Sequence, residues 1–388
     1  MPKTIHTGRL PVKLWADVVE PGAMQQILNL ADYPFAFHHI AIMPDVHEGF
    51  GMPIGGVMAT ERVIVPNAVG VDIGCGMIAV RTSLTTLGRK VLEKVVDEIR
   101  AVIPLGFRHH KRPRDMRYMP DMPVEGMPVV EREFDSARHQ VGTLGGGNHF
   151  IEIQRGSDDH IWVMIHSGSR NLGKQVADHY NRLAVSLNKK ENIKGTWEKQ
   201  LAYLYLDSEE GERYIREMKY CVAFGFANRS LMMENVLELL DFFVKGGVEE
   251  TDRVAISHNY AAEEEHFGRR VWVHRKGATP AFRGMRGIIP GSQGTASYIV
   301  AGKGNEESFS SCSHGAGRLL GRRQAIRHLD LEGEVRRLEE KGILHSLRGR
   351  KDLDEAPSAY KDIRRVIDQQ RDLVEVLVEL QPLAVVKG

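Results

Sequence analysis

Five histidines in this sequence stand in short, glycine-flanked or polar motifs at the ends of apolar runs. They are His149 in GGGNHFIEI, His166 in WVMIHSGSR, His258 in VAISHNY, His274 in VWVHRKGA and His314 in SCSHGAGR. A short apolar run rich in Val and Ile is typical of a buried strand, and the loop at its end emerges at a sheet edge where ligands bind. Imidazoles brought to one edge by several strands predict a metal centre.

A carboxylate and a thiol add to this prediction. Asp72 and Cys75 lie in the glycine-rich loop GVDIGCGM. Together with imidazoles they favour Zn, Mn, Fe or Co over Mg or Ca, which prefer oxygen ligands alone. A single histidine at a strand end is more often structural than a ligand, so the prediction depends on the whole set. The predicted ligands are Asp72, Cys75, His149, His166 and His258.

These five residues are far apart in the sequence, so no zinc-finger spacing applies and tertiary folding must assemble the site. Five protein ligands also permit a two-metal centre in which a thiolate such as that of Cys75 bridges the ions. Two-metal centres are well suited to phosphoryl chemistry.

His314 has a different setting, because it precedes GAGRLLGRRQAIRHL, which predicts a helix with a Gly-Ala-Gly first turn. The amino end of a helix attracts anions and disfavours imidazolium, so His314 would be a neutral nucleophile beside an anion site. An alternative of equal weight is that Ser311 or Ser313 caps the helix and His314 is incidental.

Three further segments are rich in small residues whose backbone N–H groups could surround phosphate oxygens. They are PGSQGTAS (290–297), RKGAT (275–279) and HSGSRNLG (166–173), with Arg170, Arg275, Lys276 and Arg318 adding positive charge. Neither the P-loop nor the dinucleotide fingerprint is present. Each segment alone is more often a turn, but together they predict several bound anionic groups near the metals.

The composition is that of an ordinary globular protein of 388 residues, with a formal net charge of +1 that neither requires nor excludes a nucleic-acid partner. The three cysteines form no CxxC pair, which favours a reducing, cytoplasmic compartment. No apolar run approaches the length needed for a signal peptide or a membrane span. We therefore expect a soluble protein without a membrane partner.

No repeat or linker divides the chain, so the sequence predicts one continuous α/β (α+β) domain over residues 1–388. Loops and short strands are expected over the first 85 residues. Helices are expected at 87–103, 171–188, 209–244 (long and interrupted) and 360 to about 380, and strands near 253–257, 270–274 and 296–300. The helical stretch of about 171–247 would be an insertion between site-bearing strands. The basic segment 107–121 is either a solvated loop or a phosphate-contacting loop.

At this point the motifs resemble those of a known family. MPDVHEGFGMPIGG, VGVDIGCGM, LGGGNHFIE, HSGSR, SHN, HRKGAT, PGSQGTASYIV, CSHGAGR, EAPSAYKDI and the terminal VKG occur in an order that resembles the RtcB family of RNA-splicing ligases. The resemblance extends from about Val12 to Lys387. It implies central β-sheets flanked by helices, with a helical insertion.

The resemblance also implies an activity. Members of this family join an RNA 3′-phosphate or 2′,3′-cyclic phosphate end to a 5′-hydroxyl end, in tRNA splicing or RNA repair, using GTP and Mn²⁺, with two ions expected. His314 would be the nucleophile that takes GMP from GTP, and the guanylate would then pass to the RNA 3′-phosphate to give an RNA-pp-G end. An archease-like activator is a possible partner, and we expect a monomer.

Matching motifs carry the family's residue roles onto this sequence. Asp72, Cys75, His149, His166 and His258 would hold manganese, while His274 falls outside the ligand set. The nucleotide would contact Asn148, Phe150, Glu152, Ser292, Ala316, Gly317, Tyr360 and Lys387. Arg170 and Arg318 would bind RNA phosphates, and Asp45 would support the site or the substrate end.

The chain departs from the family pattern modestly, with Gln293 where many members have Met, a variable loop around Phe50 and Met52, and a shorter stretch at 104–140. Two other functions remain open. A metal-dependent phosphodiesterase or hydrolase would use the same centre without a guanylate, and a non-catalytic RNA-binding relative would not depend on His314.

Overall fold

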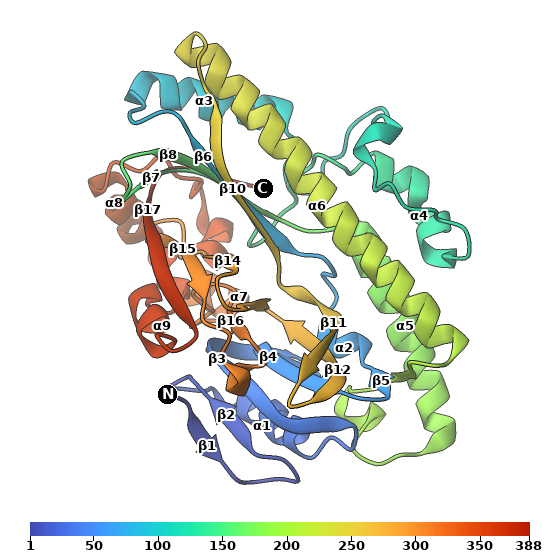
Figure 1. Ribbon diagram of the computed structural model, residues 1–388. Helices are drawn as coiled ribbons and strands as arrows, with labels where there is room; N and C mark the ends of the chain where they lie inside the picture. The colour runs from blue at the N-terminus through green and yellow to red at the C-terminus, as the bar shows by residue number, and fades with distance from the viewer.

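The computed structural model describes residues 1–388 and contains two large β-sheets, with most long helices gathered along one side (Figure 1). The seven-stranded sheet has the order β10 (Glu250–Ser257), β6 (Gly76–Thr82), β8 (Ile161–Ser167), β7 (Phe150–Gly156), β17 (Val374–Lys387), β15 (Ser297–Gly302) and β14 (Arg286–Ile289). The six-stranded sheet has the order β1 (Lys3–Ile5), β2 (Val12–Leu14), β3 (Ala36–Phe50), β4 (Met52–Thr60), β12 (Arg269–Lys276) and β11 (Asn259–His266). Two small ladders join β13 (Ala278–Pro280) to β16 (Ser311–Ser313) and β5 (Val63–Ile64) to β9 (Leu204–Tyr205).

The helices are α1 (Pro21–Ala31), α2 (Pro66–Val69), α3 (Arg89–Val102), α4 (Pro128–Arg138), α5 (Arg170–Glu191), α6 (Glu209–Val244), α7 (Arg322–His328), α8 (Leu331–Glu340) and α9 (Ile363–Gln369). Short 3-10 turns lie at Met116–Tyr118, Trp197–Lys199, Glu306–Ser308, Arg350–Glu355 and Pro357–Ala359. Helices α5 and α6 form the predicted helical segment between β8 and β10, so the α/β (α+β) class with flanking helices is confirmed.

The seven-stranded sheet buries both of its faces, and the alternation along each strand decides which face a side chain joins. In β6 and β8, Ile78 and Val163 pack against α3 and α6, whereas Met77 and Met164 pack against the opposite layer, which includes Leu338 of α8. This opposite layer matters for function, because it continues into a polar cavity at the ends of the strands.

Helix α6 is one continuous helix rather than the interrupted helix expected from the sequence. Gly225 lies in its middle, where a Cβ would come within 2.4 Å of the Gly74 carbonyl oxygen. The glycine therefore does not break the helix; it allows the loop before β6 to approach the helix closely.

Two other predictions differ from the structure. The first 85 residues contain long strands, β3 and β4, where loops and short strands were expected. The predicted helix at 360–380 is wrong beyond residue 369, because α9 ends there and β17 follows. The sequence VEVLVELQPLAVV alternates in the manner of a strand, and β17 is inserted between β7 and β15.

None of the helices combines the length and the apolar character that crossing a membrane requires.

Candidate active site

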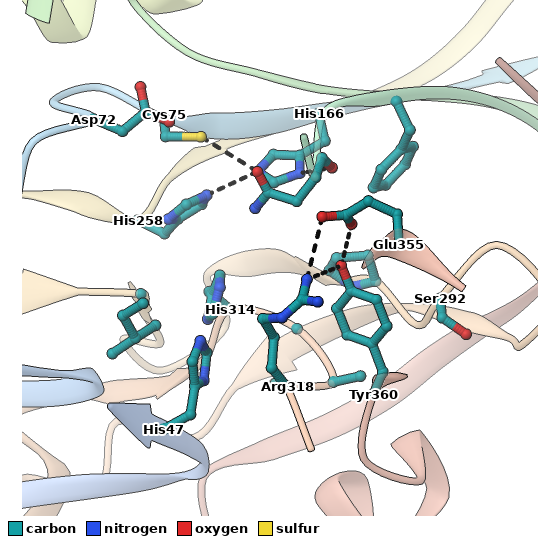
Figure 2. Close-up of a pocket in the computed structure, with 18 of the residues that line it drawn as sticks. His47, Asp72, Cys75, His166, His258, Ser292, His314, Arg318, Glu355 and Tyr360 are labelled. Carbon is teal, nitrogen blue, oxygen red and sulfur yellow. Dashed lines mark hydrogen bonds and ion pairs between the residues drawn. The ribbon is translucent and has the colours of Figure 1, made fainter. Parts of the chain in front are cut away.

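A cavity of about 420 Å³ lies between the two sheets and brings together most of the predicted site residues. Figure 2 shows Asp72, Cys75, His166 and His258 at one end, Arg318, Glu355 and Tyr360 at another, and His314 facing the space between them. The six-stranded sheet supplies residues that include His47 and Lys276, the seven-stranded sheet supplies five residues of the opposite wall, and loops supply most of the others.

Strand alternation explains that opposite wall. Phe150 and Val385 belong to the same buried layer as Met164, and side chains two residues apart on a strand share a face. Glu152, His166 and Lys387 therefore point the same way, and all three line the cavity. Lys387 pairs in register with Phe150, so the end of the chain is held beside the strand that carries Glu152.

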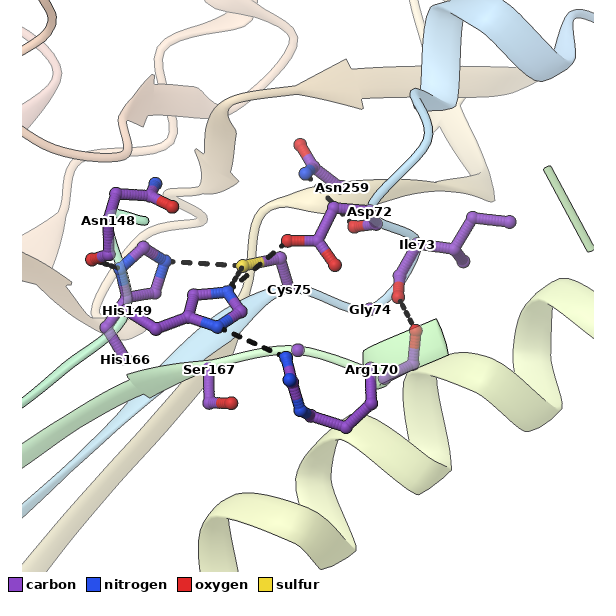
Figure 3. Close-up of polar contacts among 12 residues, drawn as sticks. Asp72, Ile73, Gly74, Cys75, Asn148, His149, His166, Ser167, Arg170 and Asn259 are labelled. Atoms are coloured by element: carbon purple, nitrogen blue, oxygen red, sulfur yellow. Dashed lines mark hydrogen bonds and ion pairs between the residues drawn. The ribbon is translucent and has the colours of Figure 1, made fainter. Parts of the chain in front are cut away.

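The metal-ligand prediction concerns five residues whose donor atoms converge, and Figure 3 shows four of them, Asp72, Cys75, His149 and His166. Cys75 Sγ lies 3.3 Å from His166 Nε2 and 3.5 Å from His149 Nε2. His166 Nε2 lies 3.1 Å from His258 Nε2, and His149 Nε2 lies 3.5 Å from Asp72 Oδ2. Two potential three-ligand groups result, Cys75 with His166 and His258, and Cys75 with Asp72 and His149. Cys75 belongs to both, which fits a thiolate shared by two cations.

The imidazoles are prepared for metal binding by their outer nitrogens. His149 Nδ1 lies 2.9 Å from the Leu144 carbonyl oxygen, and His166 Nδ1 lies 3.1 Å from the Asn148 carbonyl oxygen. A proton on each Nδ1 satisfies these contacts and leaves the Nε2 lone pair directed at Cys75. Burial also lowers the pKa values of His166 and His258, which keeps both rings neutral. This buried donor set fits a pair of divalent cations that accept nitrogen and sulfur.

Helix α6 holds the loops that carry these ligands, a role that the sequence did not predict. The buried Arg229 donates from Nη1 to the carbonyl oxygens of Gly74 at 3.0 Å and Ser167 at 2.9 Å. Asn228 accepts the Thr143 N–H at 3.0 Å and donates to the Gly168 carbonyl oxygen at 3.1 Å. One helix turn thus fixes the positions of three ligand-bearing loops.

His314 is oriented by a buried carboxylate. Asp45 Oδ2 accepts hydrogen bonds from His314 Nδ1 at 2.6 Å, from the His314 backbone N–H at 3.0 Å and from the Gly315 backbone N–H at 3.3 Å. Burial alone would raise the pKa of Asp45, but the electrostatic interaction and the hydrogen bond with His314 hold that pKa below its ordinary value. With its proton on Nδ1, His314 presents a free Nε2 lone pair to the cavity.

The setting predicted for His314 at a helix amino terminus is wrong. Helix α7 begins at Arg322, and residues 315–320 form a loop. Gly317 has a φ of +73°, and a Cβ there would lie 2.2 Å from the Asp45 carbonyl oxygen. Its left-handed backbone cannot continue into a helix, so Asp45 rather than a helix terminus fixes the state of the ring.

The other end of the cavity is organised by Glu355, which sequence reasoning missed although it opens the EAPSAYKDI motif. Its carboxylate accepts a hydrogen bond from Tyr360 OH and pairs with Arg318 Nη1 and Lys387 Nζ, both at 3.2 Å. The Arg318 guanidinium also lies over the Tyr360 ring, with its Cζ 5.1 Å from the ring centre. Three residues predicted separately thus meet on one carboxylate.

The remaining predicted residues occupy the wall between these two ends. Glu152 is buried and accepts a hydrogen bond from Gln154 at 2.6 Å. Burial raises the pKa of Glu152 to about 8, against the opposite effect of the Lys387 charge. Gln293 Nε2 donates at 2.9 Å to the Glu355 carbonyl oxygen, while Gln293 Oε1 is buried without a hydrogen-bond partner. Asn148, Phe150, Ser292, Ala316 and Gly317 also line the cavity.

Asp45 and His149 lie behind the cavity wall, in contact with His314 and Cys75, and Arg170 and His274 also lie apart from it. Arg170 stands behind the ligands, where its Nη1 approaches His149 Nδ1 at 3.5 Å. His274 is fully buried in the six-stranded sheet, where its Nε2 accepts the Val65 N–H at 3.0 Å. The exclusion of His274 from the ligand set agrees with this position.

A sequence model of the family described as tRNA-splicing ligase RtcB matches residues 26–120 and 122–388, which include every residue of the cavity. The chain belongs to the RtcB family. It is 39% identical to the RNA-splicing ligase RtcB of Escherichia coli K12, over 99% of each chain. It is also 31% identical to the tRNA-splicing ligase RtcB of Thermococcus kodakarensis and 33% identical to that of Methanococcus maripaludis, with at least 95% of each chain covered. Membership in RtcB confirms the family that the motifs indicated and makes this chain an RNA ligase by family.

Proposed function

We propose that this chain is a GTP- and Mn²⁺-dependent RNA ligase that joins 2′,3′-cyclic phosphate or 3′-phosphate ends to 5′-hydroxyl ends through a guanylate on His314. One observation carries the proposal: a single imidazole, held by a buried carboxylate, faces the same cavity as a five-residue metal-ligand set. The near full-length similarity to RNA-splicing ligases supports the choice of RNA as substrate.

The chain's own groups account for the first transfer. His314 Nε2 attacks the α-phosphorus of GTP, an N–P bond forms, and the bond to the pyrophosphate oxygen breaks. Asp45 holds the proton on Nδ1 and stabilises the positive charge that the ring acquires. Manganese held by Asp72, Cys75, His149, His166 and His258 would neutralise phosphate charge during the reaction.

Two further transfers complete the ligation. An oxygen of the RNA 3′-phosphate attacks the guanylate phosphorus, the N–P bond breaks, and an RNA-pp-G end forms. The 5′-hydroxyl then attacks the RNA phosphate and GMP leaves. A cyclic phosphate end is first hydrolysed to the 3′-phosphate. Arg318, which lines the cavity, and Arg170, which lies behind the metal ligands, are proposed to bind the RNA phosphates.

The nucleotide is proposed to occupy the wall from the metal ligands to Glu355. Asn148 would contact its phosphates, and Phe150, Glu152, Ser292, Ala316, Gly317, Tyr360 and Lys387 would surround the base and sugar. Glu152 suits a guanine edge, because its buried carboxyl has only the Gln154 amide as partner and can accept from the base N–H donors. We also propose that residues 1–388 act as one catalytic domain, as a monomer, with an archease-like activator as a candidate partner.

Incubation with α-labelled GTP and Mn²⁺ tests the proposal. The wild-type protein is expected to acquire an acid-labile, alkali-stable label and to ligate RNA with defined ends. His314→Ala should lose both while keeping its bound metal, which elemental analysis measures. Metal-dependent cleavage of a cyclic phosphate without any protein label would instead identify a hydrolase.

A further inference from the structure

We call residues Phe107–Tyr118 the basic segment, and a second cavity, of about 360 Å³, is lined by its residues from His110 to Tyr118. The segment joins α3 to α4 and is drawn in cyan to teal in Figure 1. Its sequence FRHHKRPRDMRY contains five Lys or Arg residues and one carboxylate, Asp115. That carboxylate accepts the Arg117 backbone N–H at 2.9 Å, so it is occupied within the segment itself.

The cations of the basic segment are unpaired. None of its five Lys and Arg side chains lies within 4.0 Å of a carboxylate, whereas Arg132 and Arg138 of the adjacent helix α4 each pair with one. Lys111, Arg112 and Arg117 are exposed, and Arg114 Nε is buried without any hydrogen-bond partner. Arg89, Arg155 and Arg213 elsewhere on the surface each pair with a carboxylate four residues away, whereas the cations of the basic segment are free to bind an external anion.

Aromatic groups are interleaved with these charges. The guanidinium groups of Arg114 and Arg117 lie 5.3 and 4.8 Å from the centre of the Tyr118 ring. At the other end of the segment Phe107 is completely exposed. A fully exposed phenyl ring has no role in folding, and an exposed ring beside unpaired cations is the arrangement that binds the bases and phosphates of a single strand.

The backbone of the segment is held by hydrogen bonds to neighbouring loops, so its side chains project from a defined backbone. Gly106 N–H donates to the Gly145 carbonyl oxygen at 3.0 Å, and His110 N–H donates to the His139 carbonyl oxygen at 3.0 Å. Further along, Arg114 N–H donates to the Arg138 carbonyl oxygen at 2.9 Å.

The segment also begins next to the active site. Gly145 opens the GGGNH loop, which carries the predicted ligand His149. Gly388 packs so closely between these loops that a Cβ on it would lie 2.4 Å from Gly106 N. The preceding residue, Lys387, lines the catalytic cavity. An RNA strand whose end lies in that cavity can therefore continue over Phe107 onto the basic segment.

We propose that the basic segment binds the single-stranded RNA next to the reacting end, with Phe107 stacking on an unpaired base and Lys111, Arg112 and Arg117 contacting backbone phosphates. This inference rests on the proposed ligase function. The shared chemistry is a single-stranded ribonucleotide chain, which either the 3′-phosphate or the 5′-hydroxyl substrate supplies.

The test measures binding of two labelled single-stranded RNAs, one ending in a 3′-phosphate and one in a 5′-hydroxyl, by fluorescence anisotropy over a range of salt concentrations. Phe107→Ala should weaken binding of at least one RNA by about 5- to 100-fold. The triple variant Lys111→Ala, Arg112→Ala, Arg117→Ala should reduce the slope of log affinity against log salt by about 2, because each lost phosphate contact removes about 0.7.

Matched controls separate this surface from general effects. Phe242→Ala removes another exposed phenyl ring, and Arg364→Ala, Arg365→Ala, Arg371→Ala removes three exposed charges at α9, on the other side of the molecule (Figure 1). Both should bind RNA as the wild type does. Equal losses in the controls, unchanged binding in the test variants, or equal binding of a blunt duplex would each overturn the proposal. Labelling by GTP is measured on the same preparations and should be unchanged in every variant; its absence from the wild type would contradict the ligase function separately.

Discussion

The contact between Asp45 and His314 gives the most specific prediction about catalysis. In Asp45→Asn, we expect the amide oxygen to keep the place of Oδ2, because three donors, two of them backbone N–H groups, meet there. The variant would then keep the ring orientation and the proton on Nδ1. It would lose only the negative charge, and its amide nitrogen would occupy the place of Asp45 Oδ1, which is buried and has no partner.

The lost charge determines the magnitude. In the proposed transfer to His314 Nε2, the ring would become positively charged with its Nδ1 2.6 Å from the carboxylate. Because both charges are delocalised, a separation near 4 Å is appropriate, and at an effective dielectric of about 20 the attraction is roughly 4 kcal/mol. Loss of this attraction corresponds to a rate decrease of about 10³-fold. The unsatisfied amide N–H groups should also lower the free energy of unfolding by about 1–3 kcal/mol.

The assay is single-turnover transfer of label from α-labelled GTP to the protein, with excess GTP and Mn²⁺. Glu217→Gln serves as the control, because Glu217 is a buried carboxyl that accepts from the Val129 and Val130 N–H groups and the Tyr180 hydroxyl, outside the cavity. It should lose stability and keep its labelling rate. A labelling rate for Asp45→Asn within about threefold of the wild type, where a 10³-fold decrease is expected, would refute the argument that this charge stabilises the guanylated ring.

Three further predictions follow from other contacts. Cys75→Ser should lower the metal content below two ions per chain in elemental analysis, because Cys75 belongs to both three-ligand groups. The control Cys221→Ser on α6 should keep its metal. An unchanged metal content in Cys75→Ser would contradict the role of Cys75 as a shared ligand. Lys387→Met should raise the KM for GTP by about 10-fold or more, since a charged hydrogen bond to Glu355 is lost. In the control Lys13→Met, the lost ammonium group is one that pairs with Glu307 outside the cavity, and the KM for GTP should be unchanged. Burial lowers the pKa of His274 to about 4. As the pH falls below about 6.5, His274 therefore takes up a proton in the unfolded chain but not in the folded chain, and the free energy of unfolding decreases. Between pH 7 and pH 5 the wild type should lose about 2 kcal/mol more stability than His274→Gln in urea unfolding, and parallel losses would show that His274 does not carry this effect.

The convergence of the five candidate ligands could be predicted from the sequence because strand ends and their loops carry them. Each predicted ligand lies beside a short run of Val, Ile or Met, and period-two alternation in the seven-stranded sheet places His166 on the face of Met164. The same local pattern surrounds His274, which nevertheless stays inside the six-stranded sheet. Local spacing therefore identifies strand ends, but the sheet to which a strand belongs decides whether its histidine reaches the cavity.

The supports of the site could not be read in this way, because they depend on contacts between distant segments. Arg229 lies in the middle of α6, and its partners Gly74 and Ser167 lie 155 and 62 residues away. Nothing in the helical pattern distinguishes Arg229 from a surface arginine. Only the packing of Gly225 against Gly74, which brings the loop onto the helix, makes that arginine a buried donor.

The wrong prediction of a helix up to residue 380 also arises because contacts between distant segments decide the structure, and it bears directly on function. In residues 374–380 an apolar side chain recurs at every second position, as in a strand. An isolated strand is not stable, so β17 forms only because it pairs with β7 and β15. The register shift between Pro382 and Ala384 then sets which residues of β17 face the cavity. Because Val385 faces the buried layer, Lys387 two residues later faces Glu355. The last lysine of the chain therefore reaches the site only as part of the sheet, so a change that weakens β17 pairing should impair the use of GTP even when Lys387 itself is intact.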